Sequence, residues 1–224
     1  LELKKYDDGL KQATAFLAHP YRLPTIGWPS DIKAWTLDDL QNFYHSWYAP
    51  NNCTLAVVGD VEPQQVFALA EKYFGPLARG PAAAPVRTVE PEQNGERRLV
   101  VERRAQNPLL QMAWPAIAAD DARAPALNLL QTILTGGDAS RLHRLLVEDR
   151  KLAIEVGSGW SEGFDPNIYS IYATLAGGAS TAELERVINE ELARLLATGV
   201  TPAELARARN QVAAGFWHGV ATLD

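Results

Sequence analysis

Leu152-Ala-Ile-Glu-Val-Gly-Ser-Gly-Trp160 and Ile168-Tyr-Ser-Ile-Tyr-Ala-Thr-Leu175 are two β-forming runs that flank the turn sequence Gly163-Phe-Asp-Pro-Asn167. Two such runs joined by turn residues predict an antiparallel β-hairpin. A capping box, Ser180-Thr-Ala-Glu183, then predicts a helix that ends at Gly199. Antiparallel strands kept apart from helices in this way indicate an α+β fold and not a doubly wound parallel sheet.

The passage before the hairpin, Thr135–Ile154, begins with a double glycine that ends an apolar helix predicted over Ala126–Leu134. Glycine at such a point relieves backbone strain or allows two elements to approach closely. The amphipathic helix predicted next has Leu142, Leu145 and Leu146 on one face and Arg141, Arg144 and Glu148 on the other. No residue in the passage is an obvious catalyst.

Further elements are predicted on both sides of this region. Two strand candidates, Leu99–Glu102 and Leu109–Trp114, are separated by Asn107-Pro108. After the helix that ends at Gly199, Thr201-Pro-Ala-Glu204 repeats the capping device and starts a last helix that reaches about His218.

The first third of the chain predicts helices around one strand. A short helix over about residues 10–17 stops before an irregular, proline-rich connection. Thr36 is a good N-cap for a helix that Pro50 closes, and Cys53–Val58 is long enough for one buried strand. A further helix has Pro63 near its first position and ends at Gly75-Pro76. The apolar face of the Thr36 helix consists of Leu37, Leu40, Phe43, Tyr44, Trp47 and Tyr48.

The composition changes between Leu77 and Gln93, where prolines, glycine and three consecutive alanines leave little to bury. Such a segment is typical of a linker. We therefore expect three parts: residues 1–78, a linker over 79–95, and residues 96–224.

Composition excludes several classes of protein. The 224 residues are 47% hydrophobic and 21% charged, which is usual for a globular protein able to bury a core. The net charge of −6 argues against a nucleic-acid partner, since the basic residues cluster only at Glu96-Arg-Arg98 and Glu102-Arg-Arg104. No apolar run is long enough to cross a membrane. The single cysteine, Cys53, lies in an apolar run and is interpreted as a small buried hydrophobe.

No local motif predicts a catalytic, cofactor or metal site. The four histidines are far apart and form no His-x-x-x-His pair, so we expect no zinc site in this chain. His45 and His143 are interpreted as lying away from the apolar faces of their helices, and His19 as hydrogen-bonded within its loop. Gly59-Asp60 lacks the glycines of a dinucleotide fingerprint, and Gly157-Ser-Gly159 is no nucleophile elbow.

The order of features along the chain resembles the insulinase (pitrilysin) family of zinc metallopeptidases, which includes the mitochondrial processing peptidases. The passage from Ala13-Thr-Ala-Phe16 to His19-Pro-Tyr-Arg-Leu-Pro-Thr-Ile-Gly27 is similar to one family motif. Leu55-Ala-Val-Val-Gly-Asp-Val61 looks like a family strand, and Gly136-Gly-Asp-Ala-Ser-Arg-Leu142 resembles a passage of the second half. Ala206-Arg-Ala-Arg-Asn210 resembles a helix late in that half.

The resemblance implies repeated α+β domains that enclose a proteolytic chamber. In that family the first domain carries a His-x-x-Glu-His zinc motif, and a later domain lacks metal and helps to hold the substrate. The zinc ligands and the catalytic glutamate would fall before Leu1, so none is assigned to a residue here. Residues 1–78 would close the first domain, and residues 96–224 would open the second.

Active members of the family place an arginine and a tyrosine against the substrate, in a passage that reads Leu-Arg-Glu-Lys-x-Gly-Leu-Ala-Tyr. The similar stretch here is Leu146-Val-Glu-Asp-Arg-Lys-Leu-Ala-Ile154, with Val147 at the arginine position and Ile154 at the tyrosine position. Arg150 is a possible spatial substitute. The two aliphatic residues argue against direct substrate contact by this stretch.

Two hypotheses follow from the resemblance. In the first, the chain is a non-catalytic portion of an insulinase-like zinc peptidase and builds the wall of the chamber in which the parent hydrolyses peptides; a homo- or heterodimer with a homologous peptidase subunit is a possible assembly. In the second, the parent is an inactive structural subunit of a heteromeric peptidase. The sequence begins with leucine and not methionine, so the chain is interpreted as a fragment of a longer one, and the compartment, periplasmic or cytoplasmic in a bacterium, stays open.

Overall fold

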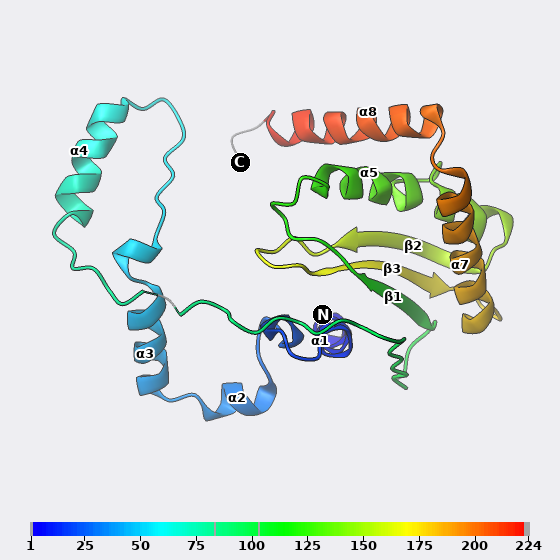
Figure 1. Cartoon of the computed structure of the whole chain (residues 1–224), viewed down its shortest axis with the longest axis horizontal. Helices are drawn as coiled ribbons and strands as arrows, with labels where there is room; N and C mark the ends of the chain where they lie inside the picture. The colour runs from blue at the N-terminus through cyan, green and yellow to red at the C-terminus, as the bar shows by residue number, and fades with distance from the viewer. Residues whose placement is uncertain (1, 83, 103, 222–224) are drawn as a thin grey trace. The chain divides into compact units, whose positions relative to one another are not determined.

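The predicted hairpin forms the centre and one edge of a three-stranded antiparallel sheet, in the order β1-β3-β2 (Figure 1). The strands are β1 (Leu109–Pro115), β2 (Ala153–Trp160) and β3 (Ile168–Leu175). This computed structural model describes residues 2–82, 84–102 and 104–221. An antiparallel sheet with separate helices confirms the predicted α+β class.

The chain divides into two units, Leu1–Gly95 and Glu96–Asp224. Three elements of the sequence predictions lie partly outside the described residues. These are Leu1 at the start of the first part, the middle one of the three linker alanines at position 83, and Arg103 in the second basic cluster. Within the described residues, no helix is long and apolar enough to cross a membrane.

The core of the second unit lies where helices pack against one face of the sheet. Val156 pairs with Ala173 across β2 and β3, and the register shifts between Ala153 and Glu155. In an antiparallel pair, residues opposite each other point to the same face. The face shared by β3 residues Ile171, Ala173 and Leu175 is fully buried.

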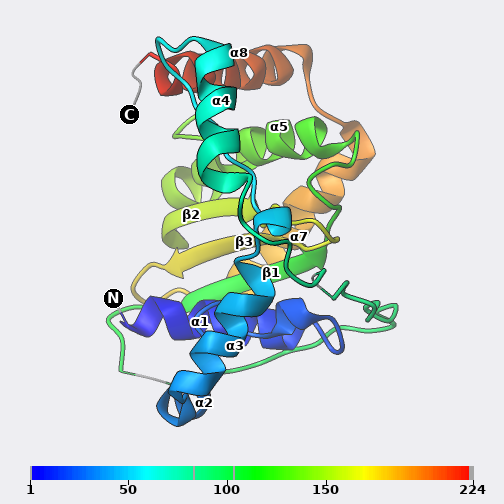
Figure 2. The same ribbon diagram turned by 90° about the vertical axis from the view of Figure 1, so that its left-hand side faces the viewer.

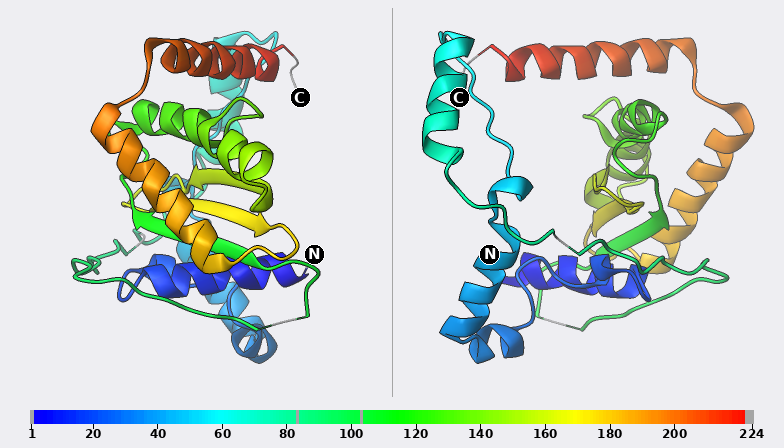
Figure 3. Two further views of the ribbon diagram at one scale, coloured as in Figure 1. Left: turned by 90° about the vertical axis from the view of Figure 1, so that its right-hand side faces the viewer. Right: turned by 60° about the vertical axis from the view of Figure 1, so that its left-hand side comes forward.

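Three parts of the helical chain cover that face. α5 (Ala124–Thr135) contributes Leu134, the turn that follows contributes Leu142 and Leu146, and α7 (Thr181–Thr198) contributes Leu184, Val187 and Ile188. α8 (Pro202–Gly219) packs on α5, on the side away from the sheet (Figures 1 and 3). The sheet, α5 and α8 therefore form successive layers within this unit.

The first unit is a series of helices joined by irregular chain. They are α1 (Glu2–Ala15), α2 (Pro29–Ala34), α3 (Leu37–Trp47) and α4 (Pro63–Phe74), with short 3₁₀ turns η1 (Pro20–Arg22) and η2 (Pro50–Asn52). The predicted cap of α3 is present, because the Thr36 hydroxyl accepts from the Asp39 N–H at 3.2 Å while Asp39 accepts from the Thr36 N–H. α4 lies alongside the extended passage before it (Figure 2).

Two predicted strands are wrong. Cys53–Val58 and Leu99–Glu102 are extended but pair with no strand among the described residues. A β-forming sequence becomes a strand only when a neighbour accepts its backbone hydrogen bonds. The expected burial of Cys53 is wrong for the same reason, since its side chain is exposed. The apolar face of α3 is also exposed, from 43% at Trp47 to 69% at Leu37.

Two helices and one helix cap differ from the predictions. α1 is longer than the predicted helix over residues 10–17, and α2 occupies part of the connection that was expected to be irregular. α7 begins at Thr181 as predicted, but the Ser180 side chain makes no capping hydrogen bond. At α8 the capping box is complete, because Thr201 Oγ1 accepts from the Glu204 N–H at 3.2 Å.

Candidate functional site

The most distinctive passage of the second unit runs from the double glycine to β2. Gly137 has a φ of 86°, a left-handed conformation that glycine adopts without strain. One helical turn, α6 (Arg141–His143), leads into a π-helix, η3 (Arg144–Asp149). The sequence predicted an ordinary amphipathic helix here, and π-helical turns have no simple sequence signal. Leu142 and Leu146 are fully buried, as their spacing predicts.

Val147 and Ile154, at the positions where the resemblance leads us to expect substrate-contacting residues, are aliphatic and differ in environment. Val147 lies in η3, is partly buried and packs against the hydrophobic core. Ile154 lies at the start of β2 beside the register shift and is 56% exposed. Neither side chain can donate a hydrogen bond to a peptide, so the chemistry of a substrate grip is missing from both positions.

Arg150 and Lys151 form the sharp turn from η3 into β2. The Arg150 N–H donates to the carbonyl of Leu145 at 3.0 Å, while its side chain is exposed and has no hydrogen bond to any other described residue. Lys151 has a φ of 52°, in the left-handed region. The similar family motif has glycine at this position. A residue with a side chain pays about 1–2 kcal/mol for this left-handed conformation, and glycine does not.

Arg141 anchors the passage to the last helix. Its guanidinium donates to both carboxylate oxygens of Glu204, at 2.6 and 2.8 Å, and to the Gly199 carbonyl at 3.0 Å. Glu191, whose side chain is 2% exposed, lies 3.4 Å from Arg141 Nη1 and accepts from Arg194 at 2.8 Å. Although the sequence places Arg141 on the face opposite the leucines, its side chain is only 11% exposed, because its partners come from α7 and α8.

The ion cluster of Arg141, Glu191, Arg194 and Glu204 shifts the pKa of two of its members, Glu204 and Arg141. The Arg141 hydrogen bond, together with the Thr201 cap, lowers the pKa of Glu204 to about 2, against the opposing effect of desolvation. The pKa of Arg141 is raised above its usual value, chiefly by the same hydrogen bond to Glu204. Both groups are held charged, which suits a structural tie and not proton transfer.

Three hydroxyl groups meet beside β2. Ser158 Oγ lies 2.7 Å from Thr135 Oγ1 and accepts from the Tyr169 hydroxyl at 2.8 Å. Burial raises the pKa of Tyr169, while its hydrogen bond to Ser158 opposes the rise. No imidazole or carboxylate is hydrogen-bonded to Ser158 in the described part of the chain, so the cluster lacks the base that a serine nucleophile needs. Ser158 is a strand residue that joins β2 to α5.

The histidines are dispersed, as the sequence predicts. The ring of His19 is buried, its Nδ1 accepts from the Tyr21 N–H at 3.2 Å, and the two rings lie 4.5 Å apart. His45 is exposed on α3, and His143 is partly buried in α6, 3.8 Å from Asp138. Over residues 2–82, 84–102 and 104–221, no three His, Cys, Asp or Glu side chains gather where they could hold a metal ion.

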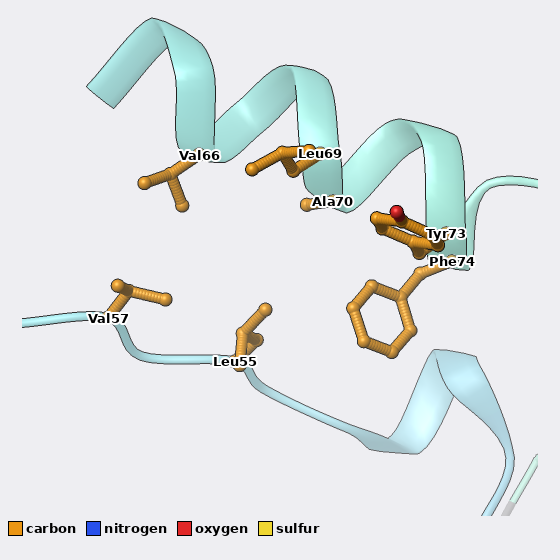
Figure 4. A pocket seen from close by; sticks show the side chains of 7 residues that line it. All are labelled: Leu55, Val57, Val66, Leu69, Ala70, Tyr73 and Phe74. Atoms are coloured by element: carbon orange, nitrogen blue, oxygen red, sulfur yellow. The ribbon is translucent and has the colours of Figure 1, made fainter. Parts of the chain in front are cut away.

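An open apolar hollow of about 220 Å³ lies in the first unit, between α4 and the extended passage before it (Figure 4). Leu55 and Val57 point toward α4 from the extended chain, and Val66, Leu69 and Phe74 line the helix side. No polar side chain but Tyr73 borders it, so it offers no catalytic group. Five of its lining side chains are exposed, from 46% at Val57 to 63% at Tyr73, while Val66 and Ala70 are partly buried.

Comparison with known proteins identifies this architecture. The fold and the glycine-led passage define an α+β domain of the peptidase type. A family model described as "Peptidase M16 inactive domain" matches residues 34–212, and the chain therefore belongs to this family. The family resemblance stated from the sequence is confirmed.

Two proteins similar to this chain in sequence are named as zinc proteases. The chain is 33% identical over 217 residues to a protein named zinc protease PqqE of Helicobacter pylori, a match that covers 91% of this chain and 46% of that protein. It is 32% identical over 212 residues to an uncharacterized zinc protease of Mycobacterium leprae, covering 93% and 47% of the two chains. The chain thus spans about half the length of these relatives.

Solved structures give the same result. A protease from Helicobacter pylori superposes with a TM-score of 0.86 at 30% identity, over 92% of this chain and 50% of that chain. A peptidase M16 inactive domain from Pseudomonas fluorescens superposes with a TM-score of 0.80 at 27% identity, over 96% and 50%. The arrangement described above is therefore that of an M16-type inactive domain.

Proposed function

We propose that the chain is a non-catalytic portion of an M16 zinc metallopeptidase and forms part of the wall of the chamber in which the parent protein hydrolyses peptides. The observation that supports this most directly is the match to an inactive-domain model across most of the chain, together with relatives named zinc proteases. In this proposal the second unit contributes surface and support, and the peptide is cut elsewhere.

Zinc belongs to the parent protein in this proposal. The names of the relatives support zinc in the family, and the described residues of this chain include no group of side chains that fits the ion. Within this chain no step of the reaction is assigned to a metal. In the parent, zinc would activate a water molecule for attack on the peptide bond, with a glutamate as general base.

The domain limits are part of the same proposal. Residues 1–78 would complete a first peptidase domain, residues 79–95 would link, and residues 96–224 would form the first part of a second domain. Support comes from Cys53–Val58, whose Leu55 and Val57 face α4 but which has no strand neighbours among the described residues. A strand with open edges accepts neighbouring strands, here from the remainder of the first domain.

The second candidate is a partner subunit without activity of its own, paired with a homologue that carries the zinc. Val147 and Ile154 favour it, because they stand where active members of the family place an arginine and a tyrosine. In this case the surface of the second unit would still form a chamber, but one that serves the partner's active site.

The test is to produce the longer polypeptide that its gene encodes, and to measure zinc content and hydrolysis of unstructured peptides. The first proposal predicts a His-x-x-Glu-His sequence before this chain, one zinc per polypeptide and measurable hydrolysis. A long polypeptide without that motif, and without hydrolysis unless a homologue is added, would favour the second candidate. The 224-residue chain by itself should bind no stoichiometric zinc, and one tightly bound zinc per chain would refute both proposals.

A further inference from the structure

The last part of the first unit, residues 80–95, is tied to the rest of that unit at two points. Near its start, the Gly80 N–H donates to the side-chain oxygen of Asn51 at 2.8 Å. A side chain on Gly80 would collide with Ala49, one of the buried apolar residues of that unit. The chain therefore packs closely on the turn after α3 at this point, although its composition predicts a free linker.

The second tie is a carboxylate held by consecutive backbone amides. Glu90 accepts from the N–H groups of Leu17, Ala18 and His19, at 2.6, 2.8 and 2.9 Å. Successive N–H groups that point at one site form a concavity suited to an anion. Charge-assisted bonds of this kind are stronger than bonds between neutral groups. Because more than 70 residues of sequence separate Glu90 from the three amides, this is a long-range contact and not a local turn.

The second unit starts with a tie of its own. Arg98 donates to both carboxylate oxygens of Glu185 on α7, at 2.9 and 2.6 Å, and also pairs with Glu96 at 2.8 Å. Between Glu90 and Glu96, the side-chain hydrogen bonds of the described residues are local, such as Gln93 Nε2 to the Gly95 carbonyl at 2.8 Å. Nothing described in Pro91–Gly95 holds this stretch to either unit.

We propose that the hinge between the units is confined to Pro91–Gly95, and that Glu90 sets its length by anchoring residues 81–90 to the first unit. With Glu90 docked, the chain from residue 90 to residue 96 can span at most about 20 Å. With Glu90 released, the free chain begins near Gly80 and its reach rises to about 55 Å. The Glu90 carboxylate thus limits how far the two units can separate.

The consequence for peptide entry rests on the proposed function, since a two-domain chamber must open at its hinge to admit substrate. The anchor itself does not rest on it. The experiment below needs no peptidase activity, so its failure would remove the hinge proposal and leave the proposed function untouched.

The experiment is backbone ¹⁵N relaxation and amide hydrogen exchange on the 224-residue chain and two variants, Glu90→Ala and the matched control Glu92→Ala. In the wild type we expect fast internal motion at residues 92–95 and rigid amides at residues 86–89. Glu90→Ala should extend the fast motion back through residues 86–89 and increase exchange of the Leu17, Ala18 and His19 amides at least tenfold. Glu92→Ala should change neither.

Trypsin provides an independent readout, because Arg87 lies between the two ties. Trypsin cleavage after Arg87 should be about tenfold faster in Glu90→Ala than in the wild type or in Glu92→Ala. Residues 86–89 as mobile as 92–95 in the wild type would overturn the proposal, even if Glu90→Ala failed to fold. Unchanged exchange, relaxation and cleavage in a folded Glu90→Ala variant would overturn it as well.

Discussion

The second unit buries an apolar core, whereas the first unit leaves most of its large apolar side chains exposed, although helices in both carry apolar faces. In the second unit, Leu142, Leu146 and Ile171 are at most 1% exposed. Among the described side chains of the first unit, the buried apolar ones are Phe16 and Ala49, each 5% exposed. Phe43 and Phe67, by contrast, are 57% and 72% exposed. Apolar periodicity therefore predicts where a helix forms, while its burial depends on elements that must pack on it.

The difference has a physical cause in the sheet. The second unit contains three strands that pair with one another, so their helices have a surface to cover. The first unit has a single extended passage with a helix beside it, and exposed apolar surface on this scale marks an interaction site. The proposal that further strands complete this unit explains both the open hollow and the exposed face of α3.

This difference in burial between the two units predicts its largest effect on stability when a buried core side chain is truncated. Leu142→Ala should lower the free energy of unfolding of the second unit by about 2–5 kcal/mol, because it leaves a cavity among fully buried side chains. Leu40→Ala, on the exposed face of α3, should change stability by less than about 0.5 kcal/mol. Urea unfolding followed by circular dichroism measures both. Equal costs would mean that the first unit buries its apolar face in solution.

The ion cluster at Arg141 comes next. Arg141→Met should cost about 3 kcal/mol, since it leaves the buried Glu191 carboxylate with less compensation. The control Arg186→Met removes an exposed pair with Glu190 on α7 and should cost less than about 0.5 kcal/mol. If thermal unfolding gave similar midpoints for the two variants, Arg141 would not be the tie between the passage and α8.

The depressed pKa of Glu204 gives the second unit a dependence on acid. The pKa of Glu204 is about 2 in the folded protein against an ordinary value of 4.5, so this stabilisation is fully present above about pH 4.5 and is lost as the pH falls toward 2. Allowing for screening by solvent, the loss should be about 1–2 kcal/mol. Glu204→Gln should flatten the unfolding free energy over that range, and an unchanged pH profile would contradict the assignment.

The smallest effect is expected at the strained turn. Lys151→Gly should raise stability by about 0.5–1 kcal/mol, because relief of the left-handed strain exceeds the added freedom of the unfolded chain. Arg150→Gly is the matched control, since residue 150 has a φ of −90°. It should lower stability by about 0.5–1 kcal/mol. A gain at both positions, or at neither, would argue against strain at Lys151.

Local signals predicted much of the fold. Turn residues and β-forming runs were sufficient for the hairpin, and the N-cap residue Thr36 and the capping box at Thr201 predicted the starts of α3 and α8. The π-helix was missed, because the Leu142/Leu145/Leu146 spacing is also that of an ordinary helix. Cys53–Val58 was predicted as a strand because its residues prefer one, but pairing requires partners that a local pattern cannot supply.

For the candidate site, the sequence predicted the residue types but not the long-range contacts. The aliphatic residues at positions 147 and 154 could be read from the sequence once the family was recognised. The inward position of Arg141 could not, because its partners Glu191 and Glu204 lie 50 and 63 residues away. Contacts of that range depend on the tertiary fold, and the Glu90 anchor is missed for the same reason.

The most direct test of the central claim, that the first unit is an incomplete domain, is amide hydrogen exchange at residues 54–58. In the 224-residue chain these amides should exchange almost as fast as in an unfolded peptide, since none donates a backbone hydrogen bond among the described residues. In the longer parent polypeptide that we propose, these amides should be protected at least a hundredfold, as in a central strand. Equal exchange in the two proteins would contradict the account.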